Sequence, residues 1–266
     1  MKFSAITLSY ALFASYVSAA PRGHSTLEER IARRAAARSS RPNQRIETSD
    51  RSNDTNVSYS TNWSGAVITS PPSGQTFNAV SASFVVPTPK APSGGSSRGT
   101  YSASAWVGID GDTYQNSILQ TGVDFTIENG VVSYDAWYEW FPDYAYDFSI
   151  QINEGDTIKA SVSSTTSISG VAVIENVTTG KTVTKSLTSS AALGGQNAEW
   201  IVEDYEEGSS LVSLANWGSV VFTGATASTK SSTLDASTAS IIDIQQSGKT
   251  LTSVTVSGST VTDKYV

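Results

Sequence analysis

The sequence contains no cysteine, and its one histidine, His24, lies near the N-terminus. The absence of cysteine excludes disulfides within the chain, thiol nucleophiles and thiolate metal sites. From about residue 54 onward histidine is absent as well, which excludes Ser-His-Asp and Cys-His catalytic machinery and leaves zinc without its usual ligands. Any acid–base chemistry in this part of the chain therefore depends on carboxyl groups. We expect no metal and no cofactor.

Long apolar runs are also scarce. The one near the N-terminus, residues 5–17, follows Lys2 and precedes the small residues of positions 17–20. It is too short and too interrupted by serine to span a bilayer, and it has the pattern of a secretory signal. We expect residues 1–20 to be a signal peptide and the mature protein to be secreted, extracellular, monomeric and not associated with membranes.

Positive charge is concentrated at one end of the chain. Nine of the 17 Lys and Arg residues lie in residues 1–53, whereas 20 of the 24 Asp and Glu residues lie in residues 54–266, which carry a formal net charge of −12. A basic run can bind nucleic acid, but the secretory leader argues against that here. We interpret residues 21–54 as a propeptide that covers an anionic cleft and inhibits it. Within this segment, residues 28–38 predict a short helix and residues 39–53 a disordered tract.

Residues 55–266 are expected to form one all-β domain. Short runs rich in Val, Ile, Thr, Tyr and Phe alternate with turns of Gly, Ser, Asn and Pro, and no long amphipathic helix is evident. So many antiparallel strands predict a two-sheet β-sandwich or jelly roll. The predicted strands cover residues 63–69, 77–86, 104–109, 117–127, 133–140, 157–164, 170–176, 182–187, 198–205, 218–222, 240–246, 251–256 and 260–265.

Three of these strands carry acids, an amide and large aromatics on one face and apolar residues on the other. Side chains two positions apart in a strand share a face. The first face holds Trp106, Gly108 and Asp110, then Gln120, Gly122 and Asp124, then Asp135, Trp137 and Glu139. Carboxylates beside tryptophans favour a lined cleft. The alternative is a set of buried, hydrogen-bonded acids that hold loops.

The run over residues 198–205 places two further acids on one face. Glu199, Ile201, Glu203 and Tyr205 share that face, and glutamate is disfavoured inside strands. An edge strand that exposes its charge to water would give the same pattern. Alternation alone does not choose between a functional Glu203 and a solvated one.

Several ordered motifs resemble those of the fungal glutamic peptidases, also called eqolisins, over nearly the whole chain after Asn56. The motifs are Trp63-Ser64-Gly65-Ala66, Trp106-Val107-Gly108-Ile109-Asp110-Gly111-Asp112, Ile118-Leu119-Gln120-Thr121-Gly122, Tyr134-Asp135-Ala136-Trp137-Tyr138-Glu139-Trp140 and Asn197-Ala198-Glu199-Trp200-Ile201-Val202-Glu203-Asp204. The resemblance implies a secreted acid endopeptidase made as a preproprotein, with a concanavalin-like sandwich of two seven-stranded sheets.

The resemblance also implies site residues. The catalytic glutamine falls on Gln120, and the catalytic glutamate falls on Glu203 rather than on Glu199. Members of the family often have a cysteine where Tyr114 stands, so the loop around this position lacks a disulfide here. Residues expected to line or support the cleft are Trp63, Trp106, Asp110, Asp124, Asp135, Trp137 and Glu139.

These residue types suit peptide hydrolysis. A carboxylate such as Glu203 can take a proton from water and later deliver it to the leaving amine, and the amide of Gln120 can orient the water and hold the oxyanion. Two alternatives remain open on the residues alone. One is a jelly-roll glycoside hydrolase that uses Glu139 and Glu203, and the other is a carbohydrate-binding module without catalysis.

Overall fold

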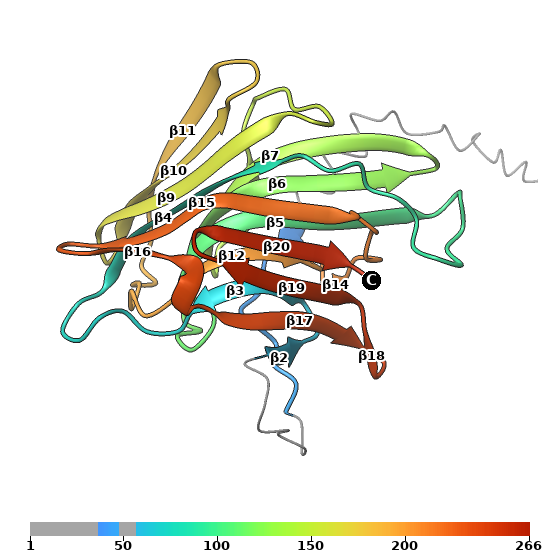
Figure 1. Ribbon diagram of the computed structural model, residues 1–266. Coiled ribbons are helices and arrows are strands. Elements are labelled where there is room, and N and C mark those ends of the chain that lie inside the picture. The colour runs from blue at the N-terminus through green and yellow to red at the C-terminus, as the bar shows by residue number, and fades with distance from the viewer. Residues whose placement is uncertain (1–36, 48–56) are drawn as a thin grey trace, which may run out of the picture.

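The computed structural model describes residues 37–47 and 57–266. Most of their strands form two stacked, mainly antiparallel sheets, and three short strands form a third (Figure 1). The eight-stranded sheet has the order β11-β10-β9-β4-β15-β20-β19, with β16 beside β15. Its strands are β4 (Phe77–Val85), β9 (Thr157–Thr166), β10 (Ser169–Asn176), β11 (Lys181–Thr188), β15 (Ser219–Thr229), β16 (Thr233–Asp235), β19 (Thr252–Ser257) and β20 (Thr260–Tyr265).

The nine-stranded sheet lies behind it in Figure 1 and has the order β18-β17-β3-β12-β5-β6-β7-β8. The ninth strand, β2, is parallel to β17, and every other pair in this sheet is antiparallel. The strands are β2 (Val57–Ser60), β3 (Trp63–Ile68), β5 (Thr100–Ile109), β6 (Ile118–Glu128), β7 (Val131–Phe141), β8 (Tyr146–Asp147), β12 (Ala198–Glu203), β17 (Ser240–Gln246) and β18 (Lys249–Thr250).

The all-β prediction is confirmed, and each of the thirteen predicted strands is present. Each sheet has seven main strands. The first sheet also contains the short strand β16, and the second also contains the short strands β8 and β18. The strand predicted to end at Phe222 continues to Thr229. Its pairing with β4 is irregular around Gly224, which has φ 62°, and this interrupts the alternation from which the strand was predicted. The described residues contain one 3₁₀ turn, η1 (Ala236–Thr238), and no helix long and apolar enough to cross a membrane.

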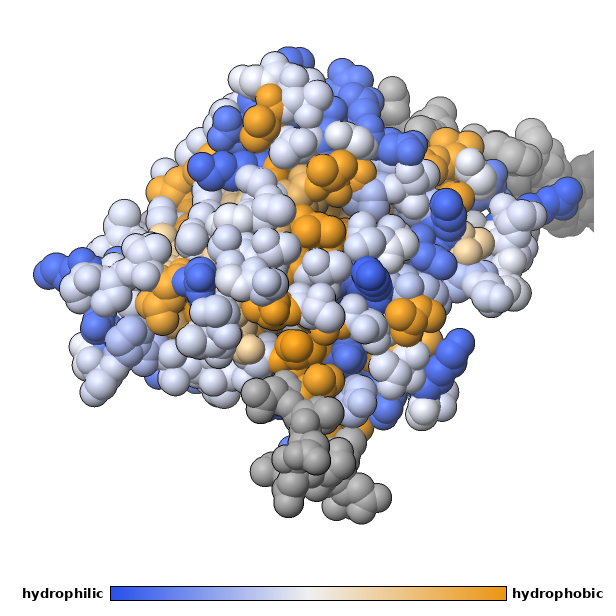
Figure 2. All heavy atoms as spheres, viewed as in Figure 1, coloured by the Kyte–Doolittle hydropathy of each residue, from blue (hydrophilic) through white to orange (hydrophobic). Residues whose placement is uncertain are grey.

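Strand alternation assigned the two faces of the nine-stranded sheet correctly. Side chains such as Val107, Val123 and Trp200 are buried in the core between the two sheets. A separate cluster on the opposite face contains Trp63, Trp106, Trp137 and neighbouring apolar residues. The outer face of the eight-stranded sheet is mainly hydrophilic, with its hydrophobic residues in separate groups (Figure 2). The face of the nine-stranded sheet that bears the tryptophans points away from the eight-stranded sheet, so a different segment must bury it.

That cover is supplied by residues 37–47, which run behind the nine-stranded sheet on the side away from the core (Figure 1). Strand β1 (Arg38–Ser39) pairs with β13 (Glu206–Glu207), which pairs with β14 (Ser210–Leu211). The prediction of a helix is wrong at residues 37 and 38, a turn and the first residue of β1, and the prediction of disorder is wrong for residues 39–47. Their order comes from contacts with the sheet, which local composition does not encode. The rest of both predictions lies outside the described residues.

Candidate active site

Cross-strand pairing arranges the candidate residues in three rows on the face covered by residues 37–47. Each row runs from β12 across β5 and β6 to β7. The glutamine row holds Glu199, Gly108, Gln120 and Glu139. The tryptophan row holds Ile201, Trp106, Gly122 and Trp137. The glutamate row holds Glu203, Ser104, Asp124 and Asp135. Neighbouring strands are about 4.8 Å apart, so side chains within a row are in reach of one another.

Gln120 and Glu203 lie on the same face, and neither side chain points into the core between the sheets. They are separated by the tryptophan row, with Trp106 on the diagonal between them. Both side chains are buried. The two amide atoms of Gln120 have no hydrogen-bond partner. A chain that crosses the strands obliquely would meet both residues.

The carboxylate of Glu203 is held by two N–H donors. The indole N–H of Trp106 donates to Oε2 at 2.9 Å, and the backbone N–H of Arg41 donates to Oε1 at 3.2 Å. Burial raises the pKa of Glu203 to about 7, although the charge of Arg38 opposes this rise. Glu203 is thus a buried carboxyl with a raised pKa that contacts the covering segment.

Arg38 is inserted into the face between the rows and is 2% exposed. Its guanidinium donates to both oxygens of Asp124, at 2.6 and 3.1 Å, and to Oε2 of Glu139 at 3.2 Å. It also lies 3.6 Å from the ring centroid of Trp137 and 4.7 Å from that of Tyr205. Two acids and two aromatic faces therefore surround one positive charge.

Ser104 completes the surroundings of this arginine. Its Oγ accepts hydrogen bonds from Arg38 Nη2 at 3.2 Å and from the indole N–H of Trp137 at 3.0 Å. Asp124 and Glu139 raise the pKa of Arg38 above its usual value despite its burial. Conversely, burial raises the pKa of Glu139 to about 8, although Arg38 and the N–H of Ser40 oppose the rise.

The covering segment passes between the carboxylates of Glu139 and Glu203. The backbone N–H of Ser40 donates to Glu139 at 3.0 Å, and the next N–H, that of Arg41, donates to Glu203. The carbonyl of Arg41 accepts from the indole of Trp63 at 3.0 Å. The main chain at residues 40–41 thus contacts both acids and one of the aromatic walls, as a bound peptide would.

Two further arginines of the segment pair with acids outside this centre. Arg41 Nε lies 2.9 Å from Glu206, and Arg45 pairs with Asp112. The side chains of Arg41 and Arg45 are 43% and 41% exposed, so water screens these pairs far more than the pair made by Arg38. Each described arginine in the segment therefore meets a carboxylate of the domain.

The aromatic wall is packed by one ring-to-ring contact and one close backbone approach. Trp63 and Trp106 meet edge to face with ring centroids 5.0 Å apart. Gly122 lies opposite Trp106, and a Cβ at this glycine would be 2.4 Å from Trp106 Cβ and 2.3 Å from the carbonyl oxygen of Ala105. The wall therefore requires glycine at position 122.

Asp110 has a different role from the cleft acids. It follows β5 at φ 70°, and its carboxylate accepts four backbone N–H groups, those of residues 194–197. In return, Asn197 Oδ1 accepts the backbone N–H groups of residues 112–114. Here the loop-holding alternative is correct, and Asp110 supports the site from its edge.

Tyr114 packs within the same pair of loops. Its ring covers Gly194, where a Cβ would come within 2.7 Å of it, and its hydroxyl donates to the carbonyl of Ala192 at 3.0 Å. The position at which the family often has a cysteine is thus a packed tyrosine. Together with Asp110 and Asn197, it fixes the loop without a covalent link.

Asp135 is partly buried and lies opposite Asp124 at the end of the glutamate row. The structure brings most of the predicted site residues onto one face, together with Arg38, Ser104 and Tyr205, to which sequence reasoning gave no role. Ser104 and Tyr205 share the strand alternation of Trp106 and Glu203, which was the available signal. For Arg38, no signal other than its positive charge was available in the sequence.

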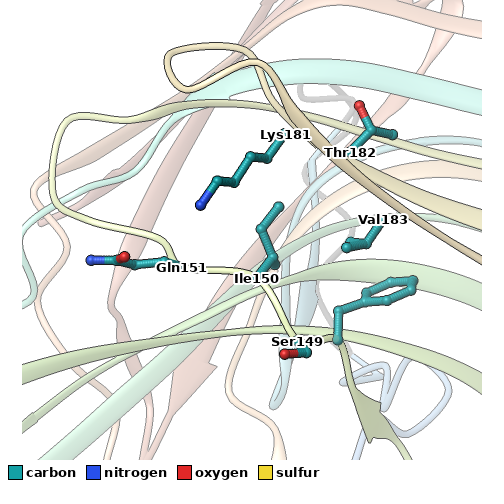
Figure 3. A pocket seen from close by; sticks show the side chains of 7 residues that line it. Ser149, Ile150, Gln151, Lys181, Thr182 and Val183 are labelled. Carbon is teal, nitrogen blue, oxygen red and sulfur yellow. The ribbon is translucent and has the colours of Figure 1, made fainter.

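A hollow lies elsewhere, between the loop of residues 148–151 and strand β11. Figure 3 shows the side chain of Lys181, from β11, above the loop that carries Ile150 and Gln151. Its volume is about 1020 Å³, but its lining lacks carboxyl groups: Phe148, Ser149, Ile150, Gln151, Lys181, Thr182 and Val183. The acids and Gln120 are all on the covered face, which is the better candidate for chemistry.

Comparisons with known proteins agree with this choice. A model described as the peptidase A4 family matches residues 61–265. Aspergillopepsin-2 of Aspergillus niger is 47% identical over 288 residues, and scytalidopepsin B of Scytalidium lignicola is 38% identical over 279; each alignment covers 100% of both chains. A solved structure of scytalido-glutamic peptidase with a transition state analog inhibitor matches with 40% identity and a TM-score of 0.69, covering 77% of this chain and 98% of that one.

Proposed function

The chain belongs to the peptidase A4 family, and on that premise we propose that it hydrolyses peptide bonds in acid with Glu203 and Gln120 as its catalytic residues. The observation that carries this proposal is the contact of two consecutive backbone N–H groups, those of Ser40 and Arg41, with Glu139 and Glu203. A polypeptide already lies across the candidate residues in the way that a substrate must.

Glu203 is the general base and then the general acid. It takes a proton from water as the water oxygen bonds to the carbonyl carbon, and it gives that proton to the nitrogen as the C–N bond breaks. The indole of Trp106 holds one carboxylate oxygen and leaves the other for the water. Departure of residues 38–41 lets water reach Glu203, which lowers the pKa that burial raises, but it also removes the charge of Arg38 and the N–H of Arg41, which hold that pKa down. A base that works in acid requires the first effect to be the larger, with a pKa near the ordinary value of about 4.3.

Gln120 orients the water and stabilises the oxyanion. Its amide offers both an acceptor and two donors and does not titrate, so it serves over the whole acid range. It is buried, and neither amide atom is committed to another protein group. Loss of one oxyanion donor typically lowers kcat by about 10²- to 10³-fold.

Residues 37–47 belong to a propeptide that inhibits the enzyme. The N–H of Arg41 occupies the Glu203 oxygen that the water needs, and Arg38 neutralises Asp124 and Glu139. Acid protonates the carboxylates that pair with the arginines and so weakens the hold on the segment. Activation at low pH thus follows from carboxyl groups that lie beside the catalytic residues.

The remaining proposals concern the ends of the chain and its partners. Residues 1–20 direct secretion, residues 21–54 form the propeptide, and residues 55–266 act as an extracellular monomer on protein substrates. A glycoside hydrolase with Glu139 and Glu203 remains the alternative on residue types alone, but the relatives named above are peptidases.

Digestion of a denatured protein at about pH 3, near the ordinary carboxyl pKa values, tests the proposal. The acid-treated chain should release peptides, whereas Glu203→Gln should release none while keeping its melting temperature, because the amide cannot accept the proton. Substantial turnover by Glu203→Gln would remove Glu203 from the base role. Activity confined to polysaccharides would favour the glycoside hydrolase.

A further inference from the structure

The glutamine row contains an unusual concentration of unsatisfied polar atoms. Among the described residues, eleven buried side-chain nitrogen and oxygen atoms have no hydrogen-bond partner, and five of them belong to this row. They are both amide atoms of Gln120, both carboxyl oxygens of Glu199 and Oε1 of Glu139. Folded proteins satisfy the great majority of such atoms, and exceptions often have a catalytic role. Glu199 is the member of the row that the proposed mechanism does not use.

Gly108 lets Glu199 approach Gln120. Glu199 on β12 and Gln120 on β6 are both directly opposite Gly108 on β5. An added Cβ at Gly108 would lie 2.9 Å from Oε1 of Glu199, so this carboxyl stands over the glycine on the side that leads to Gln120. Two strand spacings separate the Cα atoms by about 10 Å, which a glutamate and a glutamine side chain can bridge together. Any side chain at position 108 would block this approach.

The surroundings of Glu199 favour its neutral form. It is 0% exposed, and the acids near it are Asp110 and Asp112 beyond β5 and Glu139 at the β7 end of the row. The row continues on β3 and β17 with the uncharged Val67 and Ser240. No ion pair within the described ranges involves Glu199. Burial, and then the charges of Asp110 and Asp112, raise the pKa of Glu199 well above its usual value.

We propose that Glu199 is a positioning residue whose protonated carboxyl fixes the orientation of the Gln120 amide. A rotation of either side chain lets the O–H of Glu199 donate directly to Oε1 of Gln120, a contact that neither group makes in this structure, and this leaves Nε2 to donate to the oxyanion. An ionised carboxylate could only accept, so it would attract Nε2 and turn Oε1 toward the oxyanion, where it repels. This inference rests on the proposed role of Gln120.

The test compares Glu199→Leu with Glu199→Gln in the acid-activated full chain. The leucine variant should lose about 100-fold in kcat, the order expected for a misdirected oxyanion donor, with KM within about threefold. The glutamine variant should keep kcat within about threefold, because its amide also donates and accepts in the same volume. Asp263→Asn, a remote and fully buried acid, is the matched control and should leave kcat unchanged.

Combining Glu199→Leu with Gln120→Ala separates positioning from a structural role. If Glu199 acts through Gln120, its loss adds nothing in the Gln120→Ala background, whereas a purely structural role gives additive losses. Additive losses, or a leucine variant with wild-type kcat, would overturn the inference. If the leucine variant does not fold, Glu199→Met takes its place under the same criteria. Full activity of Gln120→Ala alone would instead refute the proposed function.

Discussion

Replacing Arg38 should weaken inhibition by the covering segment far more than replacing Arg45. Arg38 is 2% exposed and makes two hydrogen bonds to Asp124, one to Glu139 and one to Ser104. Breaking a buried ion pair by removing one partner costs about 3–5 kcal/mol. Because 1.4 kcal/mol corresponds to a factor of ten, binding should weaken by roughly 10²- to 10³-fold.

Arg45 supplies the matched comparison within the same segment. Asp112 is buried, but the side chain of Arg45 is 41% exposed, so water can take the place of its guanidinium, and we assign the pair about 1 kcal/mol, the upper end for exposed pairs. Replacement of Arg45 by leucine should therefore weaken binding by at most about fivefold. Arg38→Lys should fall between the two, because lysine keeps the charge but lacks the planar fork that reaches Asp124 and Glu139 together.

The assay measures inhibition of the acid-activated enzyme by synthetic peptides of residues 37–47. The parent peptide, Arg38→Leu, Arg38→Lys and Arg45→Leu are compared at about pH 5, where ordinary carboxyl groups are mostly ionised. The inhibition constants should rank in the order given above. An Arg38→Leu peptide that inhibits within threefold of the parent would refute the reasoning, since it would show that the buried ion pair does not hold the segment.

Other measurements follow from the same structure. Burial raises the pKa of Glu139 to about 8 and the pKa of Asp243 to about 6. Burial and the charge of Asp243 also raise the pKa of Asp263. Groups with a raised folded-state pKa contribute their full stability below the pKa of the unfolded state and lose that contribution as the pH rises through the folded-state pKa, here about 6 to 8 for Asp243 and Glu139. The melting temperature should therefore fall over this window and fall less in Asp243→Asn. A melting temperature that climbs steadily from pH 3 to 8 would contradict this. Asp110→Ala, which leaves four backbone N–H groups without their acceptor, should lower the free energy of unfolding by at least about 1–3 kcal/mol; an unchanged denaturant midpoint would show that water replaces the carboxylate. Substrates with Arg or Lys at the position of Arg38 should be cleaved faster than matched norleucine peptides, and Asp124→Asn should abolish the difference in kcat/KM.

The strands and their two faces could be predicted from the sequence, and the reason is geometric. Alternation with a period of two fixes which side chains share a face, whatever the tertiary context. It placed Trp106 and Gln120 on the polar, aromatic faces of their strands without any knowledge of the strand order, and it left open whether Glu203 faces a cleft or water. It did not distinguish Glu203 from Glu199, because both have the same alternation, and the resemblance made that choice.

Asp110 and Arg38 show why the rest could not be predicted. Alternation extends only to the end of a strand, and Asp110 lies one residue beyond β5 at a positive φ that turns its carboxylate to residues 194–197. Arg38 meets Asp124 from 86 residues away. Neither local composition nor spacing contains information about such a distant contact, so a segment that is ordered by the domain was expected to be disordered.

The reciprocal grip of Asp110 and Asn197 has a consequence for production of the protein. Many secreted domains fold only in an oxidising compartment, because disulfide bonds join their loops. Here a carboxylate and an amide oxygen fasten two loops that are more than 80 residues apart through main-chain N–H groups alone. Reducing agents leave this fastening intact, so the domain should assemble equally well in the bacterial cytosol and in a secretory pathway.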